Sequence, residues 1–151
     1  MSNSSKQLTS QRELISIPID SGLINLRGLS PQRLRFELEY ALERGSSANC
    51  FLFLSDKAAS EHNYPSIIVH PPGIAYSEVF LPALINALPT HTSEVFVVVG
   101  HVNPNRVALL KELAKIYTNL VLICSNPGGK LLQAIWKQAK PMENEETDNI
   151  K

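Results

Sequence analysis

Hydrophobic and polar positions follow two different patterns along the chain. In the first third, apolar residues alternate with polar ones, which is typical of strands with one buried face. We expect strands over Leu14–Ile19 and Leu23–Leu26, joined into a hairpin by the turn at residues 20–22. Residues 33–40 alternate strictly between charged and apolar side chains, so they predict a third strand with one core face. A further strand over Asn49–Leu54 is expected to pair with it antiparallel.

After residue 64 the pattern changes to short, fully apolar runs separated by stretches of helical length. The expected order is strand 67–69, helix 77–88, strand 95–99, helix 106–117, strand 120–124 and helix 129–139. Ser77 and Asn105 stand where N-caps are expected. This βαβαβα series implies parallel strands covered by helices, and the apolar strands suggest burial on both faces. The fold class is therefore α/β, with a hairpin at its start.

Composition restricts the partners and the compartment. The 14 basic side chains balance 14 acidic ones in 151 residues, so no net charge attracts nucleic acid. No apolar run approaches the roughly 18 residues of a membrane helix, and the N-terminus lacks the apolar core of a secretory signal. Cys50 and Cys124 lie in strand-like runs, which favours two buried thiols over a disulfide and predicts a cytoplasmic location.

The chain is expected to hold one folded unit, residues 13–139, between two polar ends. Residues 1–12 are Ser-rich, and residues 140–151 are acidic with almost no apolar side chain. Such segments cannot bury enough apolar surface to offset the entropy of ordering them. We therefore expect a disordered N-terminus and a disordered acidic tail.

The carboxyl ends of the predicted parallel strands are where an α/β protein places a ligand site. His101 follows one of these strands directly, and its neighbours in the loop are Asn103, Asn105 and Arg106. A metal site needs imidazoles and carboxylates as donors. Two neutral amides and a cation do not meet that need, so we expect neither a metal nor a catalytic residue here. His70 after the preceding strand is interpreted as a hydrogen-bonded rim residue, and His62 and His91 as surface residues.

A second candidate is the segment SNPGGK, which opens the last predicted helix. Its backbone N–H groups could hold a small anion such as phosphate, together with the Lys side chain. The candidate anion-binding residues are Ser125, Asn126, Gly128, Gly129 and Lys130. The segment lacks the spacing of a P-loop and of a dinucleotide fingerprint. A plain strand-to-helix turn, with Asn-Pro and Gly-Gly serving the backbone shape, is the preferred interpretation.

Three stretches taken in order resemble a known family: RLRFELEYALERGSSANCFLF, VVVGHVNPNRVALLKEL and NLVLICSNPGGKLLQAIW. They are similar to the N-terminal part of the metallo-β-lactamase-like domain of flavodiiron proteins, especially those of cyanobacteria and chloroplasts. The resemblance extends from about Leu23 to Trp136. It implies half of an αββα sandwich, because this chain has sequence for the first half only. It also implies diiron and FMN as the family's cofactors, although we expect neither in this chain.

The family's motif for iron ligands is H-x-E-x-D-H in members that reduce oxygen or nitric oxide. Laid on this sequence, its four ligand positions fall on His101, Asn103, Asn105 and Arg106, so only the first is kept. The resemblance therefore implies a remnant of a diiron loop. It is similar to the ligand-deficient paralogues that work with a ligand-complete paralogue in protecting photosystem I by oxygen photoreduction.

Three hypotheses for function follow from the residues and the resemblance. The first is a truncated, metal-ligand-deficient flavodiiron-like protein that is non-catalytic and acts by association with a partner. The second is a segment of a diflavin flavodiiron oxidoreductase that reduces oxygen to water with NAD(P)H. The third is a small-anion-binding α/β module. Half of a sandwich would expose an apolar sheet face, so we expect a homo- or hetero-oligomer with a flavodiiron-type chain and no membrane insertion.

Overall fold

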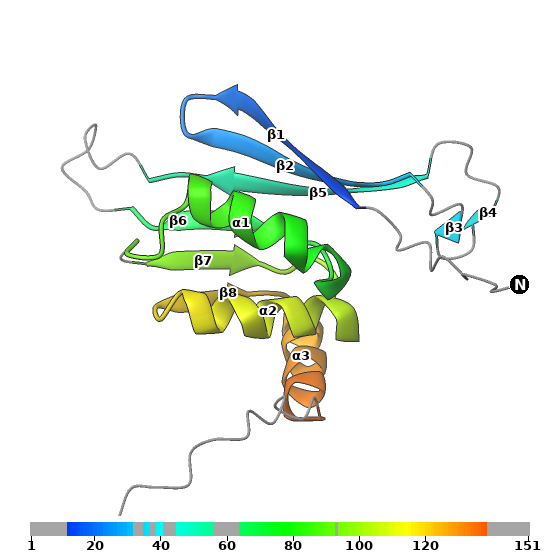
Figure 1. The fold of residues 1–151 in the computed structure, drawn as a ribbon. Helices are drawn as coiled ribbons and strands as arrows, with labels where there is room; N and C mark the ends of the chain where they lie inside the picture. Colours follow the sequence, from blue (N-terminus) through cyan, green and yellow to red (C-terminus); the bar gives the residue numbers. More distant parts are fainter. Residues whose placement is uncertain are drawn as a thin grey trace, which may run out of the picture.

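One mixed six-stranded sheet organises the part of the chain that the structure describes (Figure 1). A computed structural model describes residues 12–31, 35–36, 39–40, 45–55, 64–92 and 94–138. The strand order is β1-β2-β5-β6-β7-β8. The strands are β1 Glu13–Asp20, β2 Leu23–Ser30, β5 Ser46–Phe53, β6 Ser66–Val69, β7 Val95–Val98 and β8 Leu120–Ile123. The expected disordered ends lie outside the described residues, apart from Arg12.

The first two strands form the expected hairpin. β1 and β2 pair antiparallel through the turn at Ser21 and Gly22. Gly22 has φ 73°, a left-handed conformation that glycine adopts without the steric cost of a Cβ. β2 is longer than expected, because it continues to Ser30 while pairing with β5 over its whole length, from Leu23↔Phe53 to Ser30↔Ser46.

The predicted strand over residues 33–40 is wrong. Two short strands, β3 (Arg35–Phe36) and β4 (Glu39–Tyr40), instead pair with each other in a separate two-stranded sheet. The expected partner has no free edge, because β2 and β6 flank β5 on its two sides. β5 also begins at Ser46, earlier than expected. The predicted core face of residues 33–40 lies outside the described side chains.

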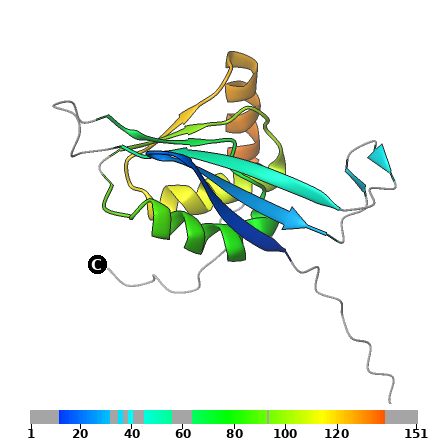
Figure 2. The same ribbon diagram turned by 90° about the horizontal axis from the view of Figure 1, so that it is seen from above.

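The second half of the chain follows the expected βαβαβα order. β6, β7 and β8 are parallel to one another. The connecting elements are η1 Ile74–Tyr76, α1 Ser77–Ala87 and α2 Pro104–Ile116, and α3 Asn126–Gln138 follows β8. α1 and α2 lie on the same face of the sheet (Figure 2), and α3 packs on α2. The core between sheet and helices includes Leu26, Leu52, Ile68, Phe80, Leu84, Val97, Leu110 and Leu113.

Both expected N-caps are wrong by one or two residues. Ser77 is the first residue of α1, and the capping residue is Tyr76, whose side chain makes no capping bond. Asn103 caps α2, since its side chain accepts a hydrogen bond from the Arg106 backbone N–H at 2.8 Å. Pro104 explains the shift, because proline has a helical φ and needs no N–H partner at the first helical position.

The opposite face of the sheet is apolar, and no described element covers it. Pairing aligns Phe51, Val69, Val98 and Ile123 in one row across four strands, and Phe53, Ile67, Phe96 and Val121 in the next. Phe53 is 46% exposed, and Val121 and Ile123 are each 42% exposed. The expectation that β8 is buried on both faces is therefore wrong, because helices cover one face only. One sheet layer with one helix layer is half of a four-layer αββα sandwich. Among the described helices, none is long and apolar enough to cross a membrane.

Candidate functional site

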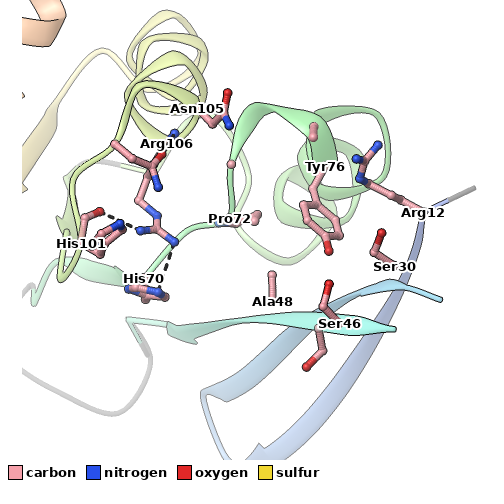
Figure 3. A pocket seen from close by; sticks show the side chains of 14 residues that line it. Arg12, Ser30, Ser46, Ala48, His70, Pro72, Tyr76, His101, Asn105 and Arg106 are labelled. Carbon is pink, nitrogen blue, oxygen red and sulfur yellow. Dashed lines mark hydrogen bonds between the residues drawn. The ribbon is translucent and has the colours of Figure 1, made fainter. Parts of the chain in front are cut away.

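The loops that follow β6 and β7 border a cavity of about 390 Å³ (Figure 3). This is the position that parallel strands predict, at their carboxyl ends. His70, His101, Asn103, Asn105 and Arg106 line one part of it, so the structure brings together the four loop positions singled out in the sequence and adds His70. Arg12, Ser30, Ser46 and Tyr76 are among the residues that line the rest.

Arg106, in the first turn of α2, ties these loops together. Its Nε donates a hydrogen bond to the Pro71 carbonyl oxygen at 2.7 Å, and its Nη1 donates one to the His101 carbonyl oxygen at 2.7 Å. Its Nη2 lies 3.2 Å from His70 Nε2. Burial lowers the pKa of Arg106 below its usual value, yet a guanidinium stays protonated in proteins. One planar cation therefore joins the loop after β6 to the loop after β7.

His70 is held in an uncommon conformation beside this cation. Its backbone has φ 58°, and it is the only described residue other than glycine with a positive φ. Burial lowers its pKa most, and the charge of Arg106 and the neighbouring His101 lower it further. A neutral imidazole can accept the Arg106 N–H at Nε2 while its proton stays on Nδ1. The expected hydrogen-bonded rim histidine is confirmed, whereas His91 is exposed and His62 lies outside the described residues.

These residues do not fit a diiron centre. Within the described ranges, no three His, Cys, Asp or Glu side chains lie close enough to hold a metal ion. Asn103 uses its amide oxygen to cap α2. Arg106 places a positive charge among the four positions that the resemblance assigns to iron ligands, where it would repel a metal cation. Of the four positions only His101 keeps a metal-binding side chain, and its carbonyl oxygen accepts from Arg106.

The SNPGGK segment is separate from this cavity. α3 begins at Asn126, so the segment forms the first turn of the helix and not a loop before it. Ser125 Oγ accepts a hydrogen bond from the Gly128 N–H at 3.2 Å, and the Ser125 carbonyl accepts one from the Gly129 N–H at 2.8 Å. Lys130 is exposed. None of its residues lines the cavity around Arg106.

The other end of the cavity is formed by residues that were not expected at a site. Arg12 falls within the segment expected to be disordered, yet its guanidinium carbon lies 5.4 Å from the centre of the Tyr76 ring. Ser30 and Ser46 come together because Ser30, the last residue of β2, pairs with Ser46, the first residue of β5. Only the pairing of β2 with β5, which local periodicity does not indicate, brings them to the cavity.

Proteins similar to this chain are flavodiiron proteins of cyanobacteria. Over 127 residues it is 39% identical to the putative diflavin flavoprotein A 6 of Nostoc sp., which covers 84% of this chain and 21% of that protein. It is 33% identical over 128 residues to the putative diflavin flavoprotein A 3 of Synechocystis sp., covering 85% of this chain and 20% of that protein. The chain thus spans about a fifth of the length of these relatives. No protein-family model matches it.

Solved structures agree with these relatives. The metal-soaked Flv1 flavodiiron core from Synechocystis superposes with a TM-score of 0.71 at 30% identity, over 85% of this chain and 30% of that one. A flavoprotein from Thermotoga maritima has a TM-score of 0.68 at 20% identity, over 84% of this chain and 30% of that one, which supports the fold. By sequence and by fold, the chain is thus a relative of the flavodiiron proteins and corresponds to the N-terminal part of their metallo-β-lactamase-like diiron domain.

Proposed function

We propose that this chain is a metal-ligand-deficient flavodiiron-like protein that is non-catalytic by itself and acts by association with a flavodiiron-type chain. The observation that carries the proposal is the position of Arg106. Its guanidinium bonds to both loops that border the site, and it stands at a family ligand position. A site closed by its own cation has no need of iron to hold its loops together.

The apolar sheet face supports the associative part of the proposal. Eight apolar side chains form two aligned rows there, and three of them are more than two-fifths exposed. Contiguous apolar surface of this kind marks protein interaction sites. A flavodiiron-type chain, or a second copy of this one, would bury these rows. We also propose a cytoplasmic location, because the two cysteines are free thiols.

Iron analysis of the purified 151-residue chain tests the non-catalytic part. The chain would be produced with added iron, and its iron content would be measured by mass spectrometry alongside a His101→Ala variant. We expect far less than one iron per chain for both proteins, and no difference between them. Stoichiometric iron in the parent chain that is lost in the variant would refute the proposal.

The second candidate is that the chain is a segment of a diflavin oxidoreductase that reduces oxygen to water with NAD(P)H. The observation that favours it is the short share, about a fifth, that the chain spans of its diflavin relatives. In that case FMN and the remaining ligands would belong to parts outside these 151 residues. The reading frame downstream of codon 151 distinguishes the two candidates, because a flavodoxin-like sequence there would support the segment and a stop codon would exclude it.

A further inference from the structure

Two buried polar atoms at the end of the cavity away from Arg106 have no hydrogen-bond partner among the described residues. Arg12 Nε and Ser46 Oγ are both buried, and neither has a hydrogen-bond partner among the residues that the structure describes. Both residues line the same cavity. Leaving a buried donor unsatisfied is costly, and more so for a charged group, so each such group calls for a missing partner. Figure 3 shows Arg12 and Ser46 on the same side of the cavity, with Arg106 across from them.

The described residues around this cavity have a one-sided charge. Two arginines and two histidines line it, and no Asp or Glu is among its described lining residues. Arg106 uses N–H groups on all three of its guanidinium nitrogens for contacts with Pro71, His101 and His70. These N–H groups are therefore not available to a ligand. Arg12 differs, because none of its donors has a carboxylate partner among the described ion pairs. A positively charged, partly enclosed cleft concentrates anions.

The Arg12 guanidinium packs on an aromatic ring. Tyr76 lies under it, and the ring is almost fully buried against β2. Gly28 makes this contact possible, since a Cβ on that residue would come within 2.7 Å of the ring. A guanidinium that packs on an aromatic face can present two parallel N–H groups to an oxyanion.

We propose that this end of the cavity binds the carboxylate or phosphate group of a small organic anion, through Arg12 and Ser46. The cavity volume of about 390 Å³ lies within the usual range of small-molecule sites, roughly 300–1,000 Å³. Ala48, Pro72 and Ala75 supply apolar lining for the body of such a molecule. This site needs no metal, so the iron measurement that tests the proposed function does not test it.

Calorimetric titration of the full chain tests the proposal, with inorganic phosphate in one arm and succinate in the other. Ionic strength is held constant with sodium chloride, because exposed charge interactions are screened by salt. We expect one of the two probes to bind with a 1:1 stoichiometry and a dissociation constant of about 1 mM or lower. The arm that binds distinguishes a phosphate from a carboxylate ligand. Absence of saturation by both probes at about 10 mM would overturn the proposal.

Four variants locate the binding. Arg12→Gln should weaken it about tenfold or more, Ser46→Ala should weaken it several-fold, and Arg12→Lys should keep part of it because the charge remains. Arg27→Gln is the matched control, since Arg27 is an exposed arginine that bonds to Asn49 outside the cavity. Circular dichroism shows whether each variant is folded. If Arg12→Gln does not fold, the affinity of Ser46→Ala still tests the assignment. If the Arg12→Gln and Ser46→Ala variants both bind the probe as tightly as the parent chain does, the assignment is overturned.

Amide chemical shifts give an independent location. On titration with the probe that binds, we expect shifts at Ser46 and Ala48 and none at Gly128 and Gly129. Shifts confined to the two glycines would place the anion at the start of α3 and overturn the assignment to Arg12.

Discussion

Among the residues of the site, Arg106 is the one whose replacement should lower the stability of the chain most. Replacing it with alanine removes two charge-assisted hydrogen bonds to the Pro71 and His101 carbonyl oxygens and leaves the His70 ring unpartnered on that side. We expect the free energy of unfolding to fall by about 2 kcal/mol. Urea denaturation followed by circular dichroism measures it.

Lys115→Ala is the control for this change. Lys115 pairs with Glu112 at 2.9 Å, but its side chain is 66% exposed. Exposed ion pairs contribute about 0.5 kcal/mol or less. Arg106→Ala should therefore destabilise the chain several times more than Lys115→Ala, and equal effects would show that the arginine bonds do not stabilise the loops.

His70 should make stability depend on pH. Its pKa is lower in the folded chain than the ordinary value of 6.5, through burial and the charge of Arg106. On acidification the unfolded chain binds the proton first, so the free energy of unfolding falls as pH drops below about 6.5. The loss ends once pH passes below the folded pKa. His70→Asn should flatten this part of the stability profile, because asparagine tolerates the left-handed backbone and does not titrate.

An exposed histidine serves as the comparison for that profile. His91 lies in the connection between α1 and β7 and is exposed. His91→Asn should change the stability profile less than His70→Asn does, because His91 is exposed and is not among the groups hydrogen-bonded to Arg106. If both variants change the slope equally, His70 is not its source.

The two cysteines should react at very different rates. Cys50 is buried on β5, and burial raises its pKa to about 12. Cys124 is only half-buried at the end of β8. Because the thiolate is the reactive form, a thiol reagent should modify about one cysteine in the native chain and both after unfolding. Rapid native modification of both would show that β5 opens readily.

At the scale of elements, the start of α2 offers a direct test of which asparagine caps it. Asn103→Ala removes the side chain that accepts from the Arg106 N–H, so we expect a loss of about 1 kcal/mol in the free energy of unfolding. Asn105→Ala is the matched control, since Asn105 lies inside the helix and is exposed. It should change stability by less than about 0.5 kcal/mol. A larger loss of stability from Asn105→Ala than from Asn103→Ala would instead support Asn105, the N-cap expected from the sequence.

The elements also show which features periodicity can predict. The β1–β2 hairpin and the series from β6 to α3 follow from local patterns, and the structure confirms them. Residues 33–40 show the limit, because alternation indicates an extended segment but does not identify its partner. The place of the Arg106 loop was predictable from the carboxyl ends of parallel strands. Arg12 and Ser46 were not, because they reach the cavity through the pairing of β2 with β5, a contact distant in sequence.

At the scale of the whole molecule, the uncovered sheet face should cause self-association when no partner is present. A Val121→Lys, Ile123→Lys double variant places two charges on exposed positions of β8 without altering its helix-facing side. We expect the parent chain to sediment as a concentration-dependent oligomer, and the double variant to shift toward monomer. Analytical ultracentrifugation measures both.

Ile85→Lys is the control for the sheet face. Ile85 is an apolar residue of α1 that is 38% exposed, and α1 packs on the opposite side of the sheet. Its replacement should leave the sedimentation profile as in the parent chain. A parent chain that stays monomeric at high concentration would contradict the role given to the apolar rows.

The bonds of Arg106 also bear on how such a chain would fare when iron is scarce. A metal that crosslinks loops must be delivered after synthesis, and its loss to a chelator loosens the fold it completes. A guanidinium is part of the polypeptide and cannot dissociate. The loops after β6 and β7 are therefore set as soon as the chain folds, and neither iron starvation nor EDTA should alter its melting temperature.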